Sequence, residues 1–438
     1  MRWADEPAPG LGPGRRQEPV PVPETAPGAE TAPEPEALAG GPAPVSDPYG
    51  AAGPGPVPDP QVECHPAGAG STAGTSGAME PGVPPETVPV RPGEELDLDA
   101  VSRFLAREVP GFPGPPLEVR QFPAGASNLT YWLRAGDWQA VLRRPPFGPL
   151  PPRAHDMVRE ATILRHLHPV FPLAPRPLAV CADPSVLGAP FYVMEYRPGV
   201  VVDRSFPGDR VPPPATCRRI AERVVDTLAD LHAVDYRQAG LGQLGRPEGF
   251  VRRQLEGWAG RWRRVETEPI PVLDPLLAWL EERVPKPAGA ALIHNDFKLN
   301  NMILSPDLDR VVAVLDWEMA TVGDPLFDLG VSLSYWVHPD DPEVLRNGLP
   351  TVTVHPGFLR RGEFVHRYAQ RTGRDVAGIG WYLVFAYFKL AVILQQIYFR
   401  WRAGQTRDPR FASFGDMARG LIELAAEAAR NGGGERLL

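Results

Sequence analysis

The chain has 438 residues, 43% of them hydrophobic, which is enough for one large bilobal domain with a tail or for two or three ordinary domains. Its formal net charge of −8 argues against a nucleic-acid-binding protein, which needs a basic face. Three scattered cysteines, Cys64, Cys181 and Cys217, and the lack of a signal-peptide pattern at the N-terminus predict a reduced, cytoplasmic protein.

Residues 1–92 are rich in Pro, Ala, Gly and Glu and show no hydrophobic period. Within residues 1–90, 12 acidic and 3 basic side chains give a formal charge of −9, so the rest of the chain is nearly neutral. Such a segment buries too little apolar surface to offset its ordering entropy. We therefore expect a disordered acidic tail. An acidic arm that binds a partner is the alternative, and Met79 could equally open the chain.

Residues 93–193 are predicted to form a small lobe built on an antiparallel sheet. Apolar residues at helical spacing indicate a first helix within 96–109. A second helix is expected at 157–168. Short segments rich in β-branched and aromatic residues predict strands at 117–122, 129–136, 138–144, 175–182 and 190–196.

From residue 200 onward the hydrophobic pattern becomes helical. Helices are predicted at 214–235, 250–264, 272–283, 326–337, 358–371, 379–402 and 414–430. The longest apolar run is interrupted by Lys389, Gln395 and Gln396. A membrane-spanning helix rarely carries three such groups, so we expect a largely buried amphipathic helix and no membrane contact. The fold class predicted from these elements is α+β.

The stretch LIHNDFKLNN, residues 292–301, places several polar side chains directly after an apolar strand. Two more apolar strands follow, NMIL and VVAVLDWE, joined by the turn-forming SPDLDR. This hairpin brings Asn301 and Asp316 together, with Asp296 just upstream. Carboxylates grouped without nearby cations repel one another unless a cation fills the site, and such oxygen ligands suit Mg²⁺. The pattern predicts a phosphoryl-transfer site in which Asp296 orients the attacking hydroxyl while Asn301 and Asp316 hold metal.

The motif HxDxxxxN, followed by DWE and GDPLFDLG, resembles the Brenner motif of the aminoglycoside phosphotransferase (choline kinase-like) superfamily, distant relatives of protein kinases. AGASNLTYWL, VLDWEMATVGDPLFDLG and FAYFKLAVILQQIYFR are similar to the phosphotransferase domain associated with some acyl-CoA dehydrogenases. The resemblance covers residues 95–430. It implies a protein kinase-like bilobal fold with a hinge at 194–199 and a helical second lobe at 200–438. It also implies ATP and Mg²⁺ as cofactors and a small-molecule hydroxyl acceptor.

The resemblance assigns nucleotide-binding roles to the small lobe. A phosphate loop is expected in PAGASN, at Gly125, Ser127 and Asn128, although alone this stretch is better interpreted as a plain turn. Arg143 takes the position of the protein-kinase lysine, and the neighbouring Arg144 is the alternative.

Further residues support these roles. Glu160, on the following helix, is expected to pair with Arg143, with a solvated glutamate as the alternative. Glu195 and Tyr196 in VMEYRPG would offer backbone groups to the adenine, although the end of an edge strand gives the same pattern.

Several residues around the loop are expected to support it. His294 is interpreted as a brace and not as a base, because a carboxylate follows it. Asp328 is expected to brace the catalytic loop by hydrogen bonds, and Glu318 to lie beside Asp316. Asp324, before Pro325, is expected to cap a helix.

The remaining histidines have structural interpretations. His232 is expected to be a hydrogen-bonded packing residue. His155, His166 and His168 are interpreted as surface residues because they lack an acidic co-ligand at metal spacing.

The acceptor is expected between the helices within 250–283 and 358–402. Their cationic and aromatic residues suit an anionic or acyl substrate better than aminoglycosides or choline: Arg252, Arg253, Arg264, Trp258, Trp262, Tyr382, Phe385, Tyr387 and Phe388. The resemblance makes a hydroxyacyl-CoA or a hydroxy acid the leading acceptor. An antibiotic phosphotransferase is one alternative. A nucleotide-binding pseudokinase scaffold is another, suggested by Arg143, the sparse glycine loop and the tail.

Overall fold

The computed structural model describes residues 82–123, 128–147, 155–349, 351–406 and 408–438. The predicted tail up to residue 81, with Cys64, lies outside the described residues, as do Gly125 and Ser127 of the predicted phosphate loop. Among the described residues, Cys181 and Cys217 are buried free thiols.

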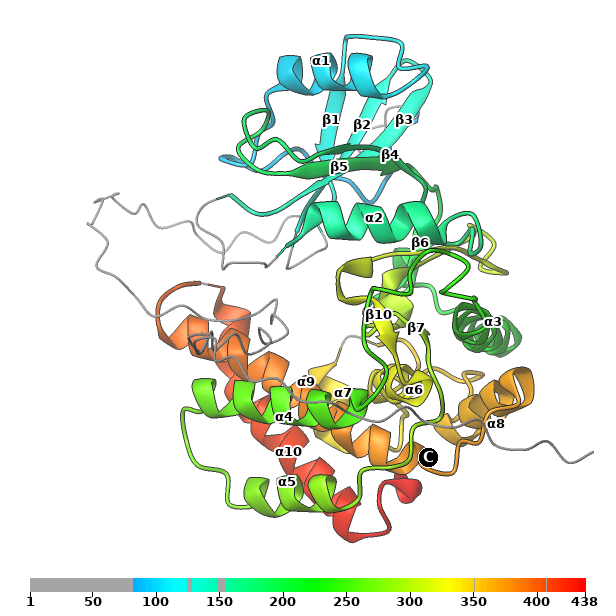
Figure 1. Cartoon of the computed structure of the whole chain (residues 1–438), viewed down its shortest axis with the longest axis vertical. Helices are drawn as coiled ribbons and strands as arrows, with labels where there is room; N and C mark the ends of the chain where they lie inside the picture. The colour runs from blue at the N-terminus through cyan, green and yellow to red at the C-terminus, as the bar shows by residue number, and fades with distance from the viewer. Residues whose placement is uncertain (1–81, 124–127, 148–154, 350, 407) are drawn as a thin grey trace, which may run out of the picture. The chain divides into compact units, whose positions relative to one another are not determined.

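The first lobe is a five-stranded antiparallel sheet with a helix on each face (Figure 1). Its strand order is β1-β2-β3-β5-β4. The strands are β1 (Glu118–Gln121), β2 (Leu129–Ala135), β3 (Trp138–Arg144), β4 (Pro177–Cys181) and β5 (Phe191–Glu195). The helices are α1 (Leu98–Glu108) and α2 (Met157–Leu167).

Strand β3 shows why this sheet is covered on both faces. Successive side chains of a strand point to opposite faces. Ala140 and Leu142 belong to the core under α1, whereas Val141 belongs to the core that α2 shares with the second lobe. Arg143 lies two residues from Val141 and therefore points to the same face, toward α2 and the second lobe.

Residues 82–92, which composition assigns to the disordered tail, are part of the first lobe. Val88 forms a bridge with Gln121 on the edge strand β1, with nitrogen to oxygen distances of 2.8 and 2.9 Å. The Arg120 guanidinium donates to the Thr87 hydroxyl at 2.9 Å and to its carbonyl at 3.0 Å. Backbone pairing at an open sheet edge needs few apolar residues, so composition could not detect it. The predicted boundary at residue 92 is therefore too late.

The second lobe is mostly helical, as predicted. Its helices are α3 (Pro214–His232), α4 (Phe250–Val265), α5 (Leu273–Glu282), α6 (Pro325–Ser334), α7 (Glu343–Gly348), α8 (Arg361–Thr372), α9 (Ile379–Arg402) and α10 (Phe414–Arg430). Single 3₁₀ turns are η1 (Pro207–Asp209), η2 (Leu299–Asn301), η3 (Trp317–Met319), η4 (Pro409–Ser413) and η5 (Glu435–Leu437). Helix α7 was not predicted because a helix this short shows no clear period.

Five short strands frame the loops of this lobe. They are β6 (Val200–Val201), β7 (Ala291–Ile293), β8 (Met302–Leu304), β9 (Val311–Val314) and β10 (Thr321–Gly323). Strands β8 and β9 form the predicted hairpin, with Met302 opposite Val314. Strand β6 adds to β8, and β10 pairs with β7. Neither β6 nor β10 was predicted, because a strand of two or three residues is too short to show an alternation of apolar and polar side chains.

Helix α9 is the core helix of this lobe. It contacts α4, α6 and α10 (Figure 1). All of its residues from Ile379 to Val392 are buried. Among the described residues it alone is long and apolar enough to span a membrane, but 72% of its most apolar window is buried inside the protein. It is largely buried, as predicted. The predicted amphipathic pattern is wrong for residues 379–392 of α9, because neighbouring helices enclose this part of the helix.

Candidate active site

One buried carboxylate holds the loop between β7 and β8. Asp328, on α6, accepts hydrogen bonds from the backbone N–H groups of His294 and Asn295 at 2.7 and 2.8 Å. The Nε2 atom of His232 lies 3.2 Å from the same carboxylate. Burial alone would raise the pKa of Asp328, but the hydrogen bond and charge of His232, with His294, outweigh it and lower this pKa. Asp328 is thus the predicted brace and His232 the predicted packing residue.

The imidazole of His294 is committed on both ring nitrogens. Nε2 donates to the carbonyl oxygen of Leu315 at 2.8 Å, and Nδ1 accepts from the Asp296 N–H at 3.3 Å. The ring also packs 4.7 Å from the Trp317 ring. A histidine with one donor and one acceptor nitrogen engaged in this way has no free nitrogen to act as a base. His294 is therefore a brace, as the sequence predicted.

The side chain of Asp296 is held by two neighbours on the same loop. Asn301 Nδ2 donates to the Asp296 backbone oxygen at 2.9 Å and to its Oδ2 at 3.0 Å. The Lys298 ammonium lies 2.8 Å from Oδ2 and 4.9 Å from the centre of the Tyr335 ring. Lys298 was missed from the sequence, although its position two residues after Asp296 could have indicated it.

The hairpin carries Asp316 to Arg143 of the first lobe. The Arg143 guanidinium forms an ion pair with Asp316, lies 3.3 Å from Glu160 on α2 and reaches within 4.0 Å of Glu318. Burial would lower the pKa of Arg143, but Glu160 and Asp316 raise it well above its usual value. The predicted pairing of Arg143 with Glu160 is confirmed. The expectation that these carboxylates lack nearby cations is wrong, because β3 brings an arginine from a distant part of the chain.

Arg144, the alternative to Arg143, faces away from this cluster. Its Nε donates to the Pro145 carbonyl and its Nη1 to the Leu187 carbonyl, both at 3.1 Å. Adjacent residues of a strand point to opposite faces, so only one arginine can reach the site.

Glu318 connects the site to the start of β2. Asn128 Nδ2 donates to Glu318 Oε2 at 2.8 Å, and the Asn128 Oδ1 lies 2.8 Å from Nδ1 of His155. Asn128, predicted to contact nucleotide, thus directs its side chain to these two residues. His155 is partly buried and hydrogen-bonded, so its prediction as a surface residue is wrong. Burial and the charge of Asp316 raise the pKa of Glu318 to about 7.

The predicted hinge joins β5 to β6. The Glu195 N–H donates to the Arg176 carbonyl at 2.9 Å, so this group is not available to an adenine. The Glu195 carboxylate accepts from Arg197. The Tyr196 hydroxyl lies 3.4 Å from Glu86 of the N-terminal segment. The nucleotide contacts of Glu195 and Tyr196 stay predictions.

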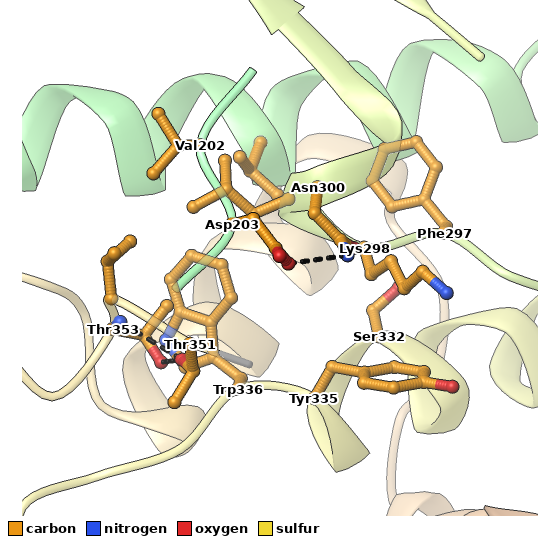
Figure 2. Close-up of a pocket in the computed structure, with 13 residues that line it drawn as sticks. Val202, Asp203, Phe297, Lys298, Asn300, Ser332, Tyr335, Trp336, Thr351 and Thr353 are labelled. Carbon is orange, nitrogen blue, oxygen red and sulfur yellow. Dashed lines mark hydrogen bonds between the residues drawn. The ribbon is translucent and has the colours of Figure 1, made fainter. Parts of the chain in front are cut away.

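A pocket lies against the loop, on the side of α6 (Figure 2). Its lining includes Lys298, Asn300, Asp203, Tyr335 and Thr353. Two of these lining residues are joined by a hydrogen bond, since Asn300 Nδ2 donates to Asp203 Oδ1 at 2.9 Å (Figure 2).

The predicted aromatic lining of the acceptor site is wrong. Its six members are buried core residues with 0–1% of their surface exposed: Trp258, Trp262, Tyr382, Phe385, Tyr387 and Phe388. Two of these residues lie on α4 and four on α9, and both helices place them in the core of the second lobe, where aromatic residues serve for packing. Asp324, in contrast, caps α6 as predicted by accepting from the Leu326 N–H at 2.9 Å.

Fold and site together define a phosphotransferase with a protein kinase-like architecture. Residues 118–354 match the model of the phosphotransferase enzyme family, and the chain belongs to this family. It is a phosphotransferase, an enzyme that acts on an alcohol group.

Three proteins illustrate the similarity. A solved structure from Ralstonia eutropha JMP134, provisionally assigned as an aminoglycoside phosphotransferase, is 33% identical, covers 77% of this chain and 99% of that chain, and has a TM-score of 0.67. Acyl-CoA dehydrogenase family member 11 of Gallus gallus is 35% identical over 81% of this chain, which spans 45% of that protein. A thermostable mutant of the aminoglycoside phosphotransferase APH(4)-Ia, solved with AMP-PNP and hygromycin B, is 18% identical and has a TM-score of 0.50. The match covers 76% of this chain and 99% of that chain, and at this identity it supports the fold alone.

Proposed function

We propose that this chain is an ATP- and Mg²⁺-dependent kinase that phosphorylates a hydroxyl group of a small acceptor. The observation that carries the proposal is the convergence of Asp296, Asn301 and Asp316, with Arg143 of the first lobe on Asp316. These groups come from three different segments, the β7–β8 loop, the end of β9 and strand β3, and a packing role for any one of them does not require the others.

The residues at the hairpin fit a divalent cation. Asn301 commits its amide nitrogen to Asp296, so its carbonyl oxygen is the end that can ligate. Asp316 supplies a carboxylate, and Glu160, Asp316 and Glu318 all lie within 4.0 Å of the Arg143 guanidinium, so carboxylates outnumber this cation in the cluster. Within the described residues no group of three or more His, Cys, Asp or Glu could hold a metal, so water and phosphate oxygens would complete the shell. When bound there, Mg²⁺ would neutralise charge on the transferred phosphoryl group.

Asp296 is proposed to hold the proton of the acceptor hydroxyl. Asn301 and Lys298 both bind Oδ2, and the described part of the chain places no hydrogen-bond partner on Oδ1. Oδ1 is therefore the atom that can accept a hydrogen bond from the acceptor and later its proton. The Lys298 ammonium places a positive charge 2.8 Å from Oδ2 of this carboxylate.

Arg143 is proposed to bind the phosphates of the nucleotide while Glu160 holds its guanidinium. The ion pair with Asp316 orders the arginine at the junction of the two lobes. An arginine presents several donors in a rigid fork and suits phosphate as well as carboxylate. The arginine at this position is therefore compatible with catalysis, which weakens the pseudokinase alternative.

The acceptor is proposed to be a hydroxyacyl-CoA or a hydroxy acid. Support comes from the sequence similarity to a protein named for acyl-CoA dehydrogenase activity. The arginines of α4, among them Arg252, Arg253 and Arg264, would suit an anionic ligand. An antibiotic acceptor is the second candidate. The Ralstonia eutropha protein, which is provisionally assigned as an aminoglycoside phosphotransferase, is covered almost completely by this chain.

An acceptor screen tests this proposal. The full chain with ATP and Mg²⁺ is assayed for ADP release with hydroxyacyl-CoAs, free hydroxy acids, choline and aminoglycosides. We expect turnover with an anionic hydroxy compound and none when Mg²⁺ is chelated. Turnover with aminoglycosides alone would favour the antibiotic alternative. ATP binding by thermal shift without turnover on any acceptor would favour the scaffold.

A further inference from the structure

A buried lysine on α9, Lys389, reaches the loop that carries Asp296. Its side chain is 3% exposed, and its ammonium donates a hydrogen bond of 2.6 Å to the carbonyl oxygen of Asn295. The centres of the Trp258 ring on α4 and the Phe327 ring on α6 each lie 5.6 Å from the ammonium. A charged group this enclosed is costly unless it has a specific partner. The partner here is the backbone beside Asp296.

The hydrogen bond falls on the peptide group that precedes Asp296. The Asn295 carbonyl and the Asp296 N–H belong to one planar unit. Lys389 binds its oxygen, and His294 Nδ1 accepts from its nitrogen at 3.3 Å. Side chains from two different elements therefore bind opposite ends of the same peptide group. The orientation of this peptide group sets the direction in which the Asp296 side chain leaves the backbone.

Asn295 adopts an unusual backbone conformation that needs this support. Its φ is 72°, in the left-handed region, which is uncommon for residues with a side chain although asparagine tolerates it. Its N–H donates to Asp328 and its Nδ2 to the Met319 carbonyl at 3.2 Å. Neither contact involves the Asn295 carbonyl. Among the described residues, Lys389 alone binds that oxygen.

We propose that Lys389, in its charged form, is a positioning residue that locks the Asn295–Asp296 peptide so that the Asp296 carboxylate faces the acceptor hydroxyl. The inference rests on the reaction proposed above. Lys389 acts through the loop backbone and needs no contact with ATP or with the acceptor.

The charges around Lys389 give this role a pH dependence. Burial lowers the pKa of Lys389 to about 8; Asp296 and Asp328 oppose this shift, whereas Lys298 and Arg261 add to it. The ammonium therefore loses its charge as the pH rises through about 8. We expect kcat of the wild-type protein to fall over the same range. Lys389→Arg stays charged, so if the larger side chain is accommodated its rate should not fall there.

A matched pair of variants separates positioning from packing. Gln395 lies on the same helix, is equally buried and donates to the Val265 carbonyl at 2.9 Å, away from the loop. Lys389→Met and Gln395→Met each remove one buried polar group bonded to a carbonyl, so both should lower Tm. Only Lys389→Met should lower kcat, by about 10- to 100-fold, because a small misplacement of a catalytic group has effects of that size. The KM for ATP should change little.

The outcomes are distinct. Equal kcat values for folded Lys389→Met and Gln395→Met would overturn the proposal. If Lys389→Met does not fold, the wild-type pH profile decides, and a rate that stays constant from pH 7 to pH 10 overturns it. A wild-type protein that turns over no acceptor contradicts the proposed reaction itself, and the role of Lys389 falls with it.

Discussion

Replacing Asp296 with asparagine should lower kcat by about 10²- to 10⁴-fold, the usual contribution of a general base. Asparagine has nearly the same shape, and its side-chain oxygen can still accept from Asn301 and Lys298. What it loses is the ability to take a proton at Oδ1. Fold and nucleotide affinity should therefore survive, and the loss should appear in kcat and not in the KM for ATP. ADP release, Tm and a nucleotide titration measure the three quantities.

A surface carboxylate provides the control for this substitution. Asp309 pairs with Arg219 at 3.0 Å in an exposed setting after β8. Asp309→Asn changes the same charge and should leave kcat and Tm close to those of the wild type, because exposed ion pairs contribute little. Wild-type turnover in Asp296→Asn would end the assignment of Asp296 as the base.

The second large effect is expected for Arg143→Met. The guanidinium is the counter-ion of Glu160 and Asp316, and its side chain is 11% exposed. Removing one partner of a buried ion pair leaves the other charges uncompensated and typically destabilises a protein by about 3–5 kcal/mol. We expect a loss of this order in the free energy of unfolding, together with weaker ATP binding. Urea denaturation and a nucleotide titration test both effects.

Arg144→Met is the matched comparison for Arg143→Met. Arg144 is also buried, but it bonds to two backbone carbonyls on the other face of β3. Its loss should cost about 1–3 kcal/mol, the penalty for leaving buried acceptors without partners. ATP affinity should be unchanged. Equal losses of ATP affinity in the two variants would contradict the placement of Arg143 in the nucleotide site.

The parts of the site that were predictable from sequence lie close together along the chain. Asn301 and Asp316 are joined by one hairpin, and a turn between two apolar strands is enough to bring its ends together. The pairing of Arg143 with Glu160 was expected from the family resemblance, which places the acid on the helix that follows the strand of the arginine. The family resemblance supplied the order of the two lobes, which no single pattern contains.

Residues that reach the site from distant segments were not predictable in this way. Lys389 interrupts an apolar run, and from the sequence alone this lysine served only as evidence against a membrane-spanning helix. Its contact with Asn295 depends on how α9 packs against the loop, which no local pattern records. The aromatic residues of α9 were misassigned for the same reason, since a helix enclosed on all sides has no polar face to show which residues pack. Residues 82–92 join the first lobe through backbone pairing, which amino-acid composition does not indicate.

The central claim is that Asn301 and Asp316 hold a divalent cation on the nucleotide, opposite Asp296. Titration of Mn²⁺ by electron paramagnetic resonance, with AMP-PNP present, measures this directly on the wild type, on Asp316→Asn and on the control Asp309→Asn. We predict that Asp316→Asn weakens Mn²⁺ binding to the protein–nucleotide complex by more than about tenfold, since it removes a charged oxygen ligand, while Asp309→Asn leaves it unchanged. Equal Mn²⁺ affinity in all three proteins would contradict the account.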